Sequence, residues 1–275
     1  MTFEGADRAP FCIGGSMFKE YLERVHQLRP VIHSITNYVT VNDVANILLA
    51  LGASPIMADD PGEVEEITAL SSGLYINIGT LNERTIPSME MAAKKACELS
   101  LPWVLDPVGA GASKLRTWTS LSLIDRYQPD VIRGNLSEIR ALALGHQTTR
   151  GVDAEGDEEL LVSIDLVVAY ARKTASIIAA TGPVDIVSDG QDTILLRNGH
   201  PDMEKVTGTG CQLSALVPAF LAASPKEPLK AASAAVALMG LAAGEGNVSY
   251  RNHIIDQIFL MTPKIFGEKV RYEIR

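Results

Sequence analysis

The segment Val206–Cys211, Val-Thr-Gly-Thr-Gly-Cys, has the clearest chemical meaning in the sequence. Apolar residues at helical spacing follow it, so we expect a helix to begin at about Cys211. Two glycines at a helix start let the backbone turn tightly and aim several N–H groups at one point, where the helix dipole also favours an anion. Gly208, Thr209 and Gly210 are therefore candidates for a phosphate cradle. An ordinary tight turn would have the same two glycines.

Cys211 falls in the first turn of that helix, where the dipole favours the thiolate form. Two interpretations remain open from spacing alone. The thiol is a small buried hydrophobic group, as most free cysteines are, or it faces an acceptor hydroxyl as a weak base or positioning group. A third use, as a covalent nucleophile, lacks a histidine close to it in sequence.

Asp106 ends an apolar segment and precedes the glycine-rich turn Pro107–Ala112. A carboxylate in that place can hold Mg²⁺, or the waters around it, beside phosphate groups. An aspartate that only caps a turn is equally common in such a place. The two interpretations stay open at this stage.

Arg133, Asn135 and Glu138 follow the next apolar segment. Arg133 can reach a phosphate, and Glu138 can bind a metal through water. Asn135 and Glu138 also have the three-residue spacing of a capping box, in which each side chain bonds the backbone of the other residue at a helix start. The capping role and the metal role are compatible.

Thr181 ends another expected strand, where its hydroxyl can bind a phosphate or close a turn. Asn37 and Met57 also follow expected strands. Asn37 can hydrogen-bond a heteroaromatic ring and Met57 can pack on one, although a helix cap and a core position are the commoner uses of these residue types. His33 lies among strand residues, so we expect a hydrogen-bonded core histidine and not a base.

The elements that must position these residues alternate along the chain. We expect strands at Val31–Ser34, Ser54–Met57, Leu74–Ile78, Trp103–Leu105, Asp130–Ile132, Ser176–Ala180, Asp185–Ser188 and Thr193–Arg197. We expect helices at Met17–Arg29, Val41–Leu51, Gly62–Leu70, Leu115–Tyr127, Leu136–Leu144, Leu160–Thr174, Cys211–Ala223, Leu229–Gly244 and His253–Met261. A further helix follows the strand that ends at Ile78 and extends to Leu99. This order predicts right-handed βαβ units in a mostly parallel sheet, with antiparallel strands at one edge.

Composition limits the class of protein. The 275 residues suit one α/β domain, which we place at residues 17–275 after a loose arm, Met1–Ser16. A net charge of −9 without a run of Lys or Arg argues against binding to nucleic acid or an anionic membrane. Three cysteines without a C-x-x-C pair fit a reducing cytoplasm, and we find no signal peptide or membrane-spanning segment. No Walker A sequence or Gly-x-Ser-x-Gly elbow is present.

Taken in order, the motifs resemble the hydroxyethylthiazole kinase family from about Arg29 to the C-terminal helices. The matching segments are His33–Asn37, Ala50–Met57, Asn77–Thr80, Leu105–Ala112, Arg133–Asn135 with Glu138, Gly151–Asp153, Thr181–Gly182 with Val184–Asp185, Asn198–His200 and Thr207–Cys211. Each motif is modest, but their order is specific. The resemblance implies a three-layer ribokinase-like fold, with a mostly parallel central sheet and helices on both faces. It also implies a homotrimer with active sites between subunits.

The resemblance further implies ATP-dependent phosphorylation, with Mg²⁺, of the hydroxyethyl group of a thiazole. The residues at matching positions take the following roles. Met57, Asn37 and Gly208 would contact the thiazole, Arg133 and Thr181 would contact ATP, and Asp106 and Glu138 would organise the metal. Cys211 stands where related sugar and pyrimidine kinases carry an aspartate base, and this thiol is typical of thiazole kinases.

Three alternatives remain beside that expectation. The first is a related kinase of another alcohol, such as a hydroxymethylpyrimidine, pyridoxal or a sugar; Cys211 in place of aspartate argues against it. The second is a non-catalytic nucleotide-binding relative, and the third is a thiol enzyme. One segment departs from the family pattern: Gly246–Tyr250 reads Gly-Asn-Val-Ser-Tyr, where the family often has Gly-Pro-Gly-Ser-Phe.

Overall fold

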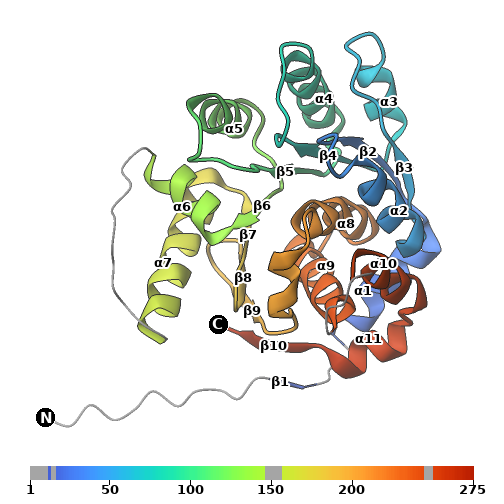
Figure 1. Ribbon diagram of the computed structural model, residues 1–275, viewed down its shortest axis with the longest axis vertical. Coiled ribbons are helices and arrows are strands. Elements are labelled where there is room, and N and C mark those ends of the chain that lie inside the picture. The colour runs from blue at the N-terminus through green and yellow to red at the C-terminus, as the bar shows by residue number, and fades with distance from the viewer. Residues whose placement is uncertain (1–11, 14–16, 146–156, 245–249) are drawn as a thin grey trace, which may run out of the picture.

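A single ten-stranded sheet forms the centre of the protein in the computed structural model, which describes residues 12–13, 17–145, 157–244 and 250–275 (Figure 1). Its strands lie in the order β1-β10-β9-β8-β7-β6-β5-β4-β2-β3. The six neighbours from β7 to β3 are parallel: β2 (Val31–Ile35), β3 (Ser54–Ile56), β4 (Gly73–Asn77), β5 (Trp103–Asp106), β6 (Val131–Asn135) and β7 (Ile177–Thr181). The others pair antiparallel: β8 (Asp185–Ser188), β9 (Thr193–Leu196), β10 (Arg271–Ile274) and β1 (Cys12–Ile13).

Helices cover both faces of the sheet, as Figure 1 shows. One face packs against α1 (Lys19–Leu28), α2 (Val41–Leu51), α8 (Thr209–Ala223), α9 (Pro228–Ala243), α10 (Tyr250–Leu260) and α11 (Pro263–Lys269). The other face packs against α3 (Val64–Leu70), α4 (Thr85–Leu99), α5 (Lys114–Tyr127), α6 (Leu136–Leu144) and α7 (Asp157–Thr174). Each parallel strand except the edge strand β3 gives apolar side chains to both cores, as expected for strands buried on two sides. The three-layer fold class predicted from the sequence is confirmed.

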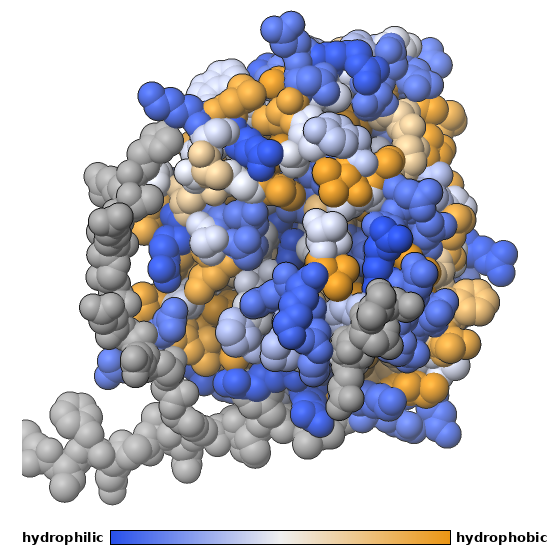
Figure 2. All heavy atoms as spheres, viewed as in Figure 1, coloured by the Kyte–Doolittle hydropathy of each residue, from blue (hydrophilic) through white to orange (hydrophobic). Residues whose placement is uncertain are grey.

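The inner helices α8 and α9 are apolar nearly all round. Their buried residues are mostly Ala, Leu and Val, which lets α8 pack closely against α1, α2 and α9 as well as the sheet. The face drawn in Figure 2 differs from this interior, because hydrophilic side chains there are interspersed with small groups of hydrophobic ones. None of the helices described by the structure is long and apolar enough to cross a membrane.

Most predicted elements match the structure to within two or three residues, and the bounds of α2, α6 and β8 coincide with the expected ones. The antiparallel edge is confirmed, and Gly190 closes the turn after β8 with a φ of +90°. Two C-terminal elements were missed, α11 and β10, because both are short and β10 owes its existence to pairing with β9. In the predicted arm, Cys12–Ile13 pairs with β10; the remainder of Met1–Ser16 lies outside the described residues.

The parallel strands end at one edge of the sheet, and this edge carries the polar residues. Asn77 ends β4, Asp106 ends β5, Asn135 ends β6 and Thr181 ends β7. Asn37 follows β2 by two residues. Ligands bind at the carboxyl ends of the strands in open α/β sheets, so the fold brings distant parts of the sequence to one place.

Candidate active site

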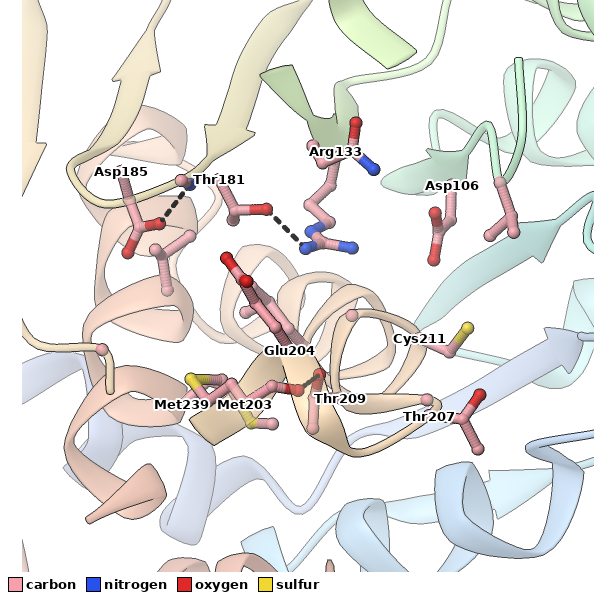
Figure 3. Close-up of a pocket in the computed structure, with 18 of the residues that line it drawn as sticks. Asp106, Arg133, Thr181, Asp185, Met203, Glu204, Thr207, Thr209, Cys211 and Met239 are labelled. Atoms are coloured by element: carbon pink, nitrogen blue, oxygen red, sulfur yellow. Dashed lines mark hydrogen bonds between the residues drawn. The ribbon is translucent and has the colours of Figure 1, made fainter. Parts of the chain in front are cut away.

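A pocket of about 860 Å³ opens at this edge of the sheet, and α8 begins within it (Figure 3). Nine of the ten residues predicted for the site line it: Asn37, Asp106, Arg133, Glu138, Thr181, Gly208, Thr209, Gly210 and Cys211. The tenth, Met57, is not among its lining residues and is 36% exposed just after β3. The structure therefore brings together every predicted residue except Met57.

The start of α8 has the form expected of a phosphate cradle. Gly208 is the N-cap with a φ of +89°, and no side chain caps the helix there. The first backbone N–H groups of a helix have no intrahelical acceptor, so they are available to an anion in the pocket. Space is also tight, because a Cβ at Gly208 would lie 2.6 Å from Cγ2 of Thr40, and one at Gly210 would lie 2.5 Å from Nη1 of Arg133.

Arg133 comes from β6 and is only 8% exposed. Its Nη2 donates to Oγ1 of Thr181 over 2.7 Å, while its Nε is buried without a hydrogen-bond partner among the described residues. In Figure 3 the guanidinium lies between Thr181 on one side and Asp106 on the other, facing the start of α8. A guanidinium held in this way presents N–H groups and positive charge to a phosphate.

Asp106 is completely buried. Its Oδ2 accepts hydrogen bonds from Nδ2 of Asn77 over 2.9 Å and from the hydroxyl of Tyr75 over 3.2 Å. Its Oδ1 makes no hydrogen bond of regular geometry to a described residue, although the hydroxyl of Ser214 is near enough to lower the pKa of the carboxyl. Burial raises that pKa to about 6; the positive charge of Arg133 opposes this rise and the negative charge of Glu138 adds to it.

Glu138 forms the predicted capping box at the start of α6. Its Oε2 accepts from the backbone N–H of Asn135 over 2.9 Å, and Oδ1 of Asn135 accepts from the backbone N–H of Glu138 over 2.9 Å. The other oxygen, Oε1, accepts from the N–H of Gly109 over 2.8 Å and so fixes the glycine-rich turn after β5. The capping interpretation is confirmed, and these hydrogen bonds hold the carboxylate of Glu138 rigidly at the pocket.

The donor set suits a magnesium ion that is shared with phosphates. No cluster of three or more His, Cys, Asp and Glu side chains that could hold a metal occurs in the part of the chain that the structure describes. Asp106, however, keeps one buried oxygen without a regular partner, and Glu138 is close enough to affect its pKa. Mg²⁺ commonly takes one or two carboxylates and completes its shell with water and phosphate oxygens.

Cys211 lies at the start of α8, where it is 8% exposed. Its Sγ accepts hydrogen bonds from Nδ2 of Asn37 and from Nδ2 of Asn77, each over 3.3 Å. Burial raises the pKa of the thiol and the negative charge of Asp106 adds to the rise, while the nearby hydroxyl of Thr40 and the hydrogen bonds from the two asparagines oppose it. The expectation that the helix dipole alone would favour the thiolate is outweighed by burial and by this neighbouring charge.

Asn37 and His33 lie on or just after β2. The Oδ1 of Asn37 accepts from the N–H groups of Val39 and Thr40, each over 3.1 Å, so the side chain caps the turn before α2 and also faces the pocket. His33 is fully buried, and its ring nitrogens bond Oγ1 of Thr68 and the carbonyl oxygen of Ala58. The prediction of a core histidine is confirmed.

Two residues at this edge of the sheet had no role assigned from the sequence. Asn77 ends β4 and donates to the carboxylate of Asp106 on the next strand, and Asp185, which lines the pocket, begins β8. Burial raises the pKa of Asp185 to about 6. The hydrogen bond from the N–H of Gly182 and the positive charge of Arg133 both lower this pKa, but by less than burial raises it. A polar residue at the carboxyl end of an apolar strand was a signal for Asn77, as it was for Asp106. Asp185 follows a turn and gave no such signal.

Comparison with solved structures defines the class of protein. The structure of a hydroxyethylthiazole kinase protein from Pyrococcus horikoshii OT3 superposes with a TM-score of 0.87 at 38% identity, covering 95% of this chain and 100% of that one. The structure of a pyridoxal kinase from Staphylococcus aureus superposes with a TM-score of 0.58 at 16% identity, covering 89% and 97%, which shows a shared fold. The fold is therefore that of the ribokinase-like small-molecule kinases.

Comparison of sequences narrows the class to a family. The model of the hydroxyethylthiazole kinase family matches residues 22–264. A hydroxyethylthiazole kinase of Clostridium acetobutylicum is 51% identical over 271 residues, covering 94% of this chain and 99% of that protein. One of Methanococcus maripaludis is 47% identical over 222 residues, covering 81% and 82%. The chain belongs to the hydroxyethylthiazole kinase family, as its motifs indicated.

Proposed function

We propose that this protein transfers the γ-phosphoryl group of ATP to the hydroxyethyl group of 4-methyl-5-(2-hydroxyethyl)thiazole, a step of thiamin salvage. The observation that carries the proposal is the content of one pocket, which holds the glycine turn of α8, the Arg133 guanidinium and the Cys211 thiol together. The names of the relatives that match nearly the whole chain support the choice of substrate.

ATP would lie with its phosphates between β6 and the start of α8. Arg133 and Thr181 would contact the phosphates from the sheet, and the N–H groups of Thr209 and Gly210 would contact them from the helix. The two sets converge on one place, since a Cβ at Gly210 would lie 2.5 Å from Nη1 of Arg133. Charge that develops on the transferred group would then meet fixed donors on both sides.

Asp106 and Glu138 would hold magnesium and the waters around it. When bound, the ion would supply positive charge to the β- and γ-phosphate oxygens. The burial of Asp106 means that its carboxylate would face the ion with little competing water. Glu138 would contribute without leaving its capping bonds, because a carboxylate oxygen has two lone pairs.

The transfer forms a bond between the alcohol oxygen and the γ-phosphorus and breaks the bond that joins this phosphorus to ADP, while the alcohol proton passes to an oxygen of the transferred phosphoryl group and from there to water. Such a loose transition state needs well-positioned reactants and neutralisation of the phosphate charge more than it needs a strong base. Cys211 and Gly208 line the pocket beside Asn37, and we assign the thiazole to this part of it. There the thiol would face the acceptor hydroxyl as a positioning group or weak base.

The place of Met57 fits a homotrimer with sites between subunits. Met57 does not line the pocket of its own chain, and neither does Tyr38, which is 77% exposed. We infer that these side chains cover the pocket of a neighbouring subunit and that Met57 packs there on the thiazole ring.

The absence of paired cysteine motifs in the sequence is consistent with a protein that functions in the reducing cytoplasm.

The direct test is product formation with Mg-ATP and the thiazole alcohol. Phosphorus NMR should show a new phosphomonoester resonance that grows as ATP is converted to ADP. Loss of ATP without a new ester would mean hydrolysis only, and no loss of ATP would favour a non-catalytic relative.

A further inference from the structure

Two asparagine side chains from different strands meet at the sulfur of Cys211. Nδ2 of Asn37, which follows β2, and Nδ2 of Asn77, which ends β4, each lie 3.3 Å from Sγ. Asn37 is 4% exposed and Asn77 is 1% exposed. Buried amide groups of this kind are usually held in one orientation by their partners, so the partners decide what the sulfur faces.

The orientation of the Asn77 amide follows from its oxygen. Oδ1 accepts from the backbone N–H of Gly79 over 2.9 Å and from Nδ2 of Asn37 over 3.0 Å. Both of these atoms are donors only, so the amide cannot be turned over without placing N–H against N–H. The amino group of Asn77 must therefore point toward Cys211.

The same amino group reaches the carboxylate beside the thiol. Nδ2 of Asn77 lies 2.9 Å from Oδ2 of Asp106 and 2.8 Å from the hydroxyl of Tyr75, as well as 3.3 Å from Sγ. It has two hydrogens for these three acceptors. Asn77 is thus the group that keeps a carboxylate and a sulfur close together by donating to both.

We propose that Asn77 is a positioning residue for phosphoryl transfer, which acts through Cys211 by holding its sulfur against the substrate hydroxyl. The proposal deepens the proposed function and rests on it. The charged or titratable groups around the sulfur are Asp106 from β5, Tyr75 from β4 and, beyond Gly210, Arg133 from β6. Without the amide donors, the sulfur would lose the bonds that keep it beside Asp106, and it would turn to another rotamer.

A double-mutant cycle tests whether Asn77 acts through Cys211. Asn77→Ser keeps a hydroxyl that can bond the N–H of Gly79 but is too short to reach the sulfur. Asn77→Asp keeps the shape of the side chain and the oxygen that bonds the N–H of Gly79, and it is the alternative variant if Asn77→Ser does not fold. Each is made in the wild type and in Cys211→Ala, and kcat and KM for ATP are measured with the thiazole alcohol.

In the wild-type background we expect kcat to fall about 10-fold to 100-fold, with KM for ATP changed less than about twofold, because a small displacement of a reacting group can cost that much. In the Cys211→Ala background the same substitution should cost less than about threefold. The matched control is Asn46→Ser, which removes an exposed amide group that donates to Asn42 and has no bond to Asp106 or to the sulfur. Its cost should be equal in both backgrounds.

Equal losses for the Asn77 variants in both backgrounds would overturn the proposal, and so would a higher KM for ATP at unchanged kcat. Wild-type turnover on a different alcohol alone would contradict the proposed substrate, and the same cycle on that alcohol would still decide the role of Asn77. A wild type inactive on every alcohol would overturn both.

Discussion

The guanidinium of Arg133 and the hydroxyl of Thr181 are joined by a 2.7 Å hydrogen bond between Nη2 and Oγ1. This bond connects the carboxyl ends of β6 and β7 and leaves Nε of the buried arginine without a partner among the described residues. The pair is therefore already ordered without a ligand, which would reduce the entropy that the proposed binding of phosphate must offset.

Arg133→Gln should raise the Kd for Mg-ATP by about 10-fold to 100-fold, because a hydrogen bond to a charged group contributes about 1.5 to 3 kcal/mol. Thr181→Val should have a smaller effect, since its main role toward Arg133 is orientation. Isothermal titration calorimetry measures both. Arg126→Gln, which removes an exposed arginine paired with Glu90, is the control and should leave the Kd unchanged. Equal affinity in Arg133→Gln and the wild type would contradict the assignment of Arg133 to ATP.

Gly208→Val should abolish turnover. The φ of +89° is strained for any side chain, and a Cβ would meet Thr40 at 2.6 Å inside the pocket. Gly52→Val is the matched control, because Gly52 has the same φ of +89° at the end of α2 but has only a ring carbon of His26, at 3.7 Å, near its Cβ. Both variants should lower Tm, whereas only Gly208→Val should lose kcat when both are assayed well below their Tm. Turnover at the wild-type rate in Gly208→Val would rule out the cradle.

Asp106→Asn should remove activity yet stabilise the free protein. Since the folded-state pKa of about 6 lies above the usual value of 3.8, the folded state binds this proton more tightly than the unfolded state. The free energy of unfolding therefore falls as pH rises from about 4 to 6, and the charged carboxylate costs about 3 kcal/mol above that range. Urea unfolding without ATP or magnesium should show Asp106→Asn more stable than the wild type at pH 8, and the difference should vanish near pH 4. A variant less stable than the wild type at pH 8 would contradict this account.

Mixed subunits test the assignment of Met57 to a neighbouring site. Met57→Ala should raise KM for the thiazole, and Cys211→Ala should lower kcat. If each site combines Met57 of one chain with Cys211 of another, co-expression of the two variants creates some sites with both native residues. Turnover at low thiazole concentration should then exceed the sum of the separate variants. Activity equal to that sum, or a monomer in light scattering, would contradict shared sites.

The sequence predicted well which residues share the pocket where these lie at the ends of parallel strands. Asp106, Arg133 and Thr181 each follow an apolar segment, and the parallel arrangement makes such ends neighbours. The glycine turn before α8 was recognisable for a similar reason, since its two glycines and the following apolar helix form a local pattern. These are features that depend on residues close together in sequence.

What the sequence did not reveal depends on contacts between distant segments. The bonds from Asn37 and Asn77 to Cys211 join residues 174 and 134 positions apart, and no local pattern marks them. The raised pKa of the thiol likewise comes from burial and from Asp106, whereas the helix start suggested a thiolate. β10 escaped prediction because its pairing partners, β9 and β1, are far away in the chain.

The most direct test of the proposed function is a coupled ADP-release assay with Mg-ATP that compares hydroxyethylthiazole with hydroxymethylpyrimidine, pyridoxal and ribose. We expect turnover on the thiazole, with kcat/KM for the other three alcohols lower by at least about 100-fold, which corresponds to about 3 kcal/mol of transition-state discrimination. A higher kcat/KM on any of the other three would contradict this expectation.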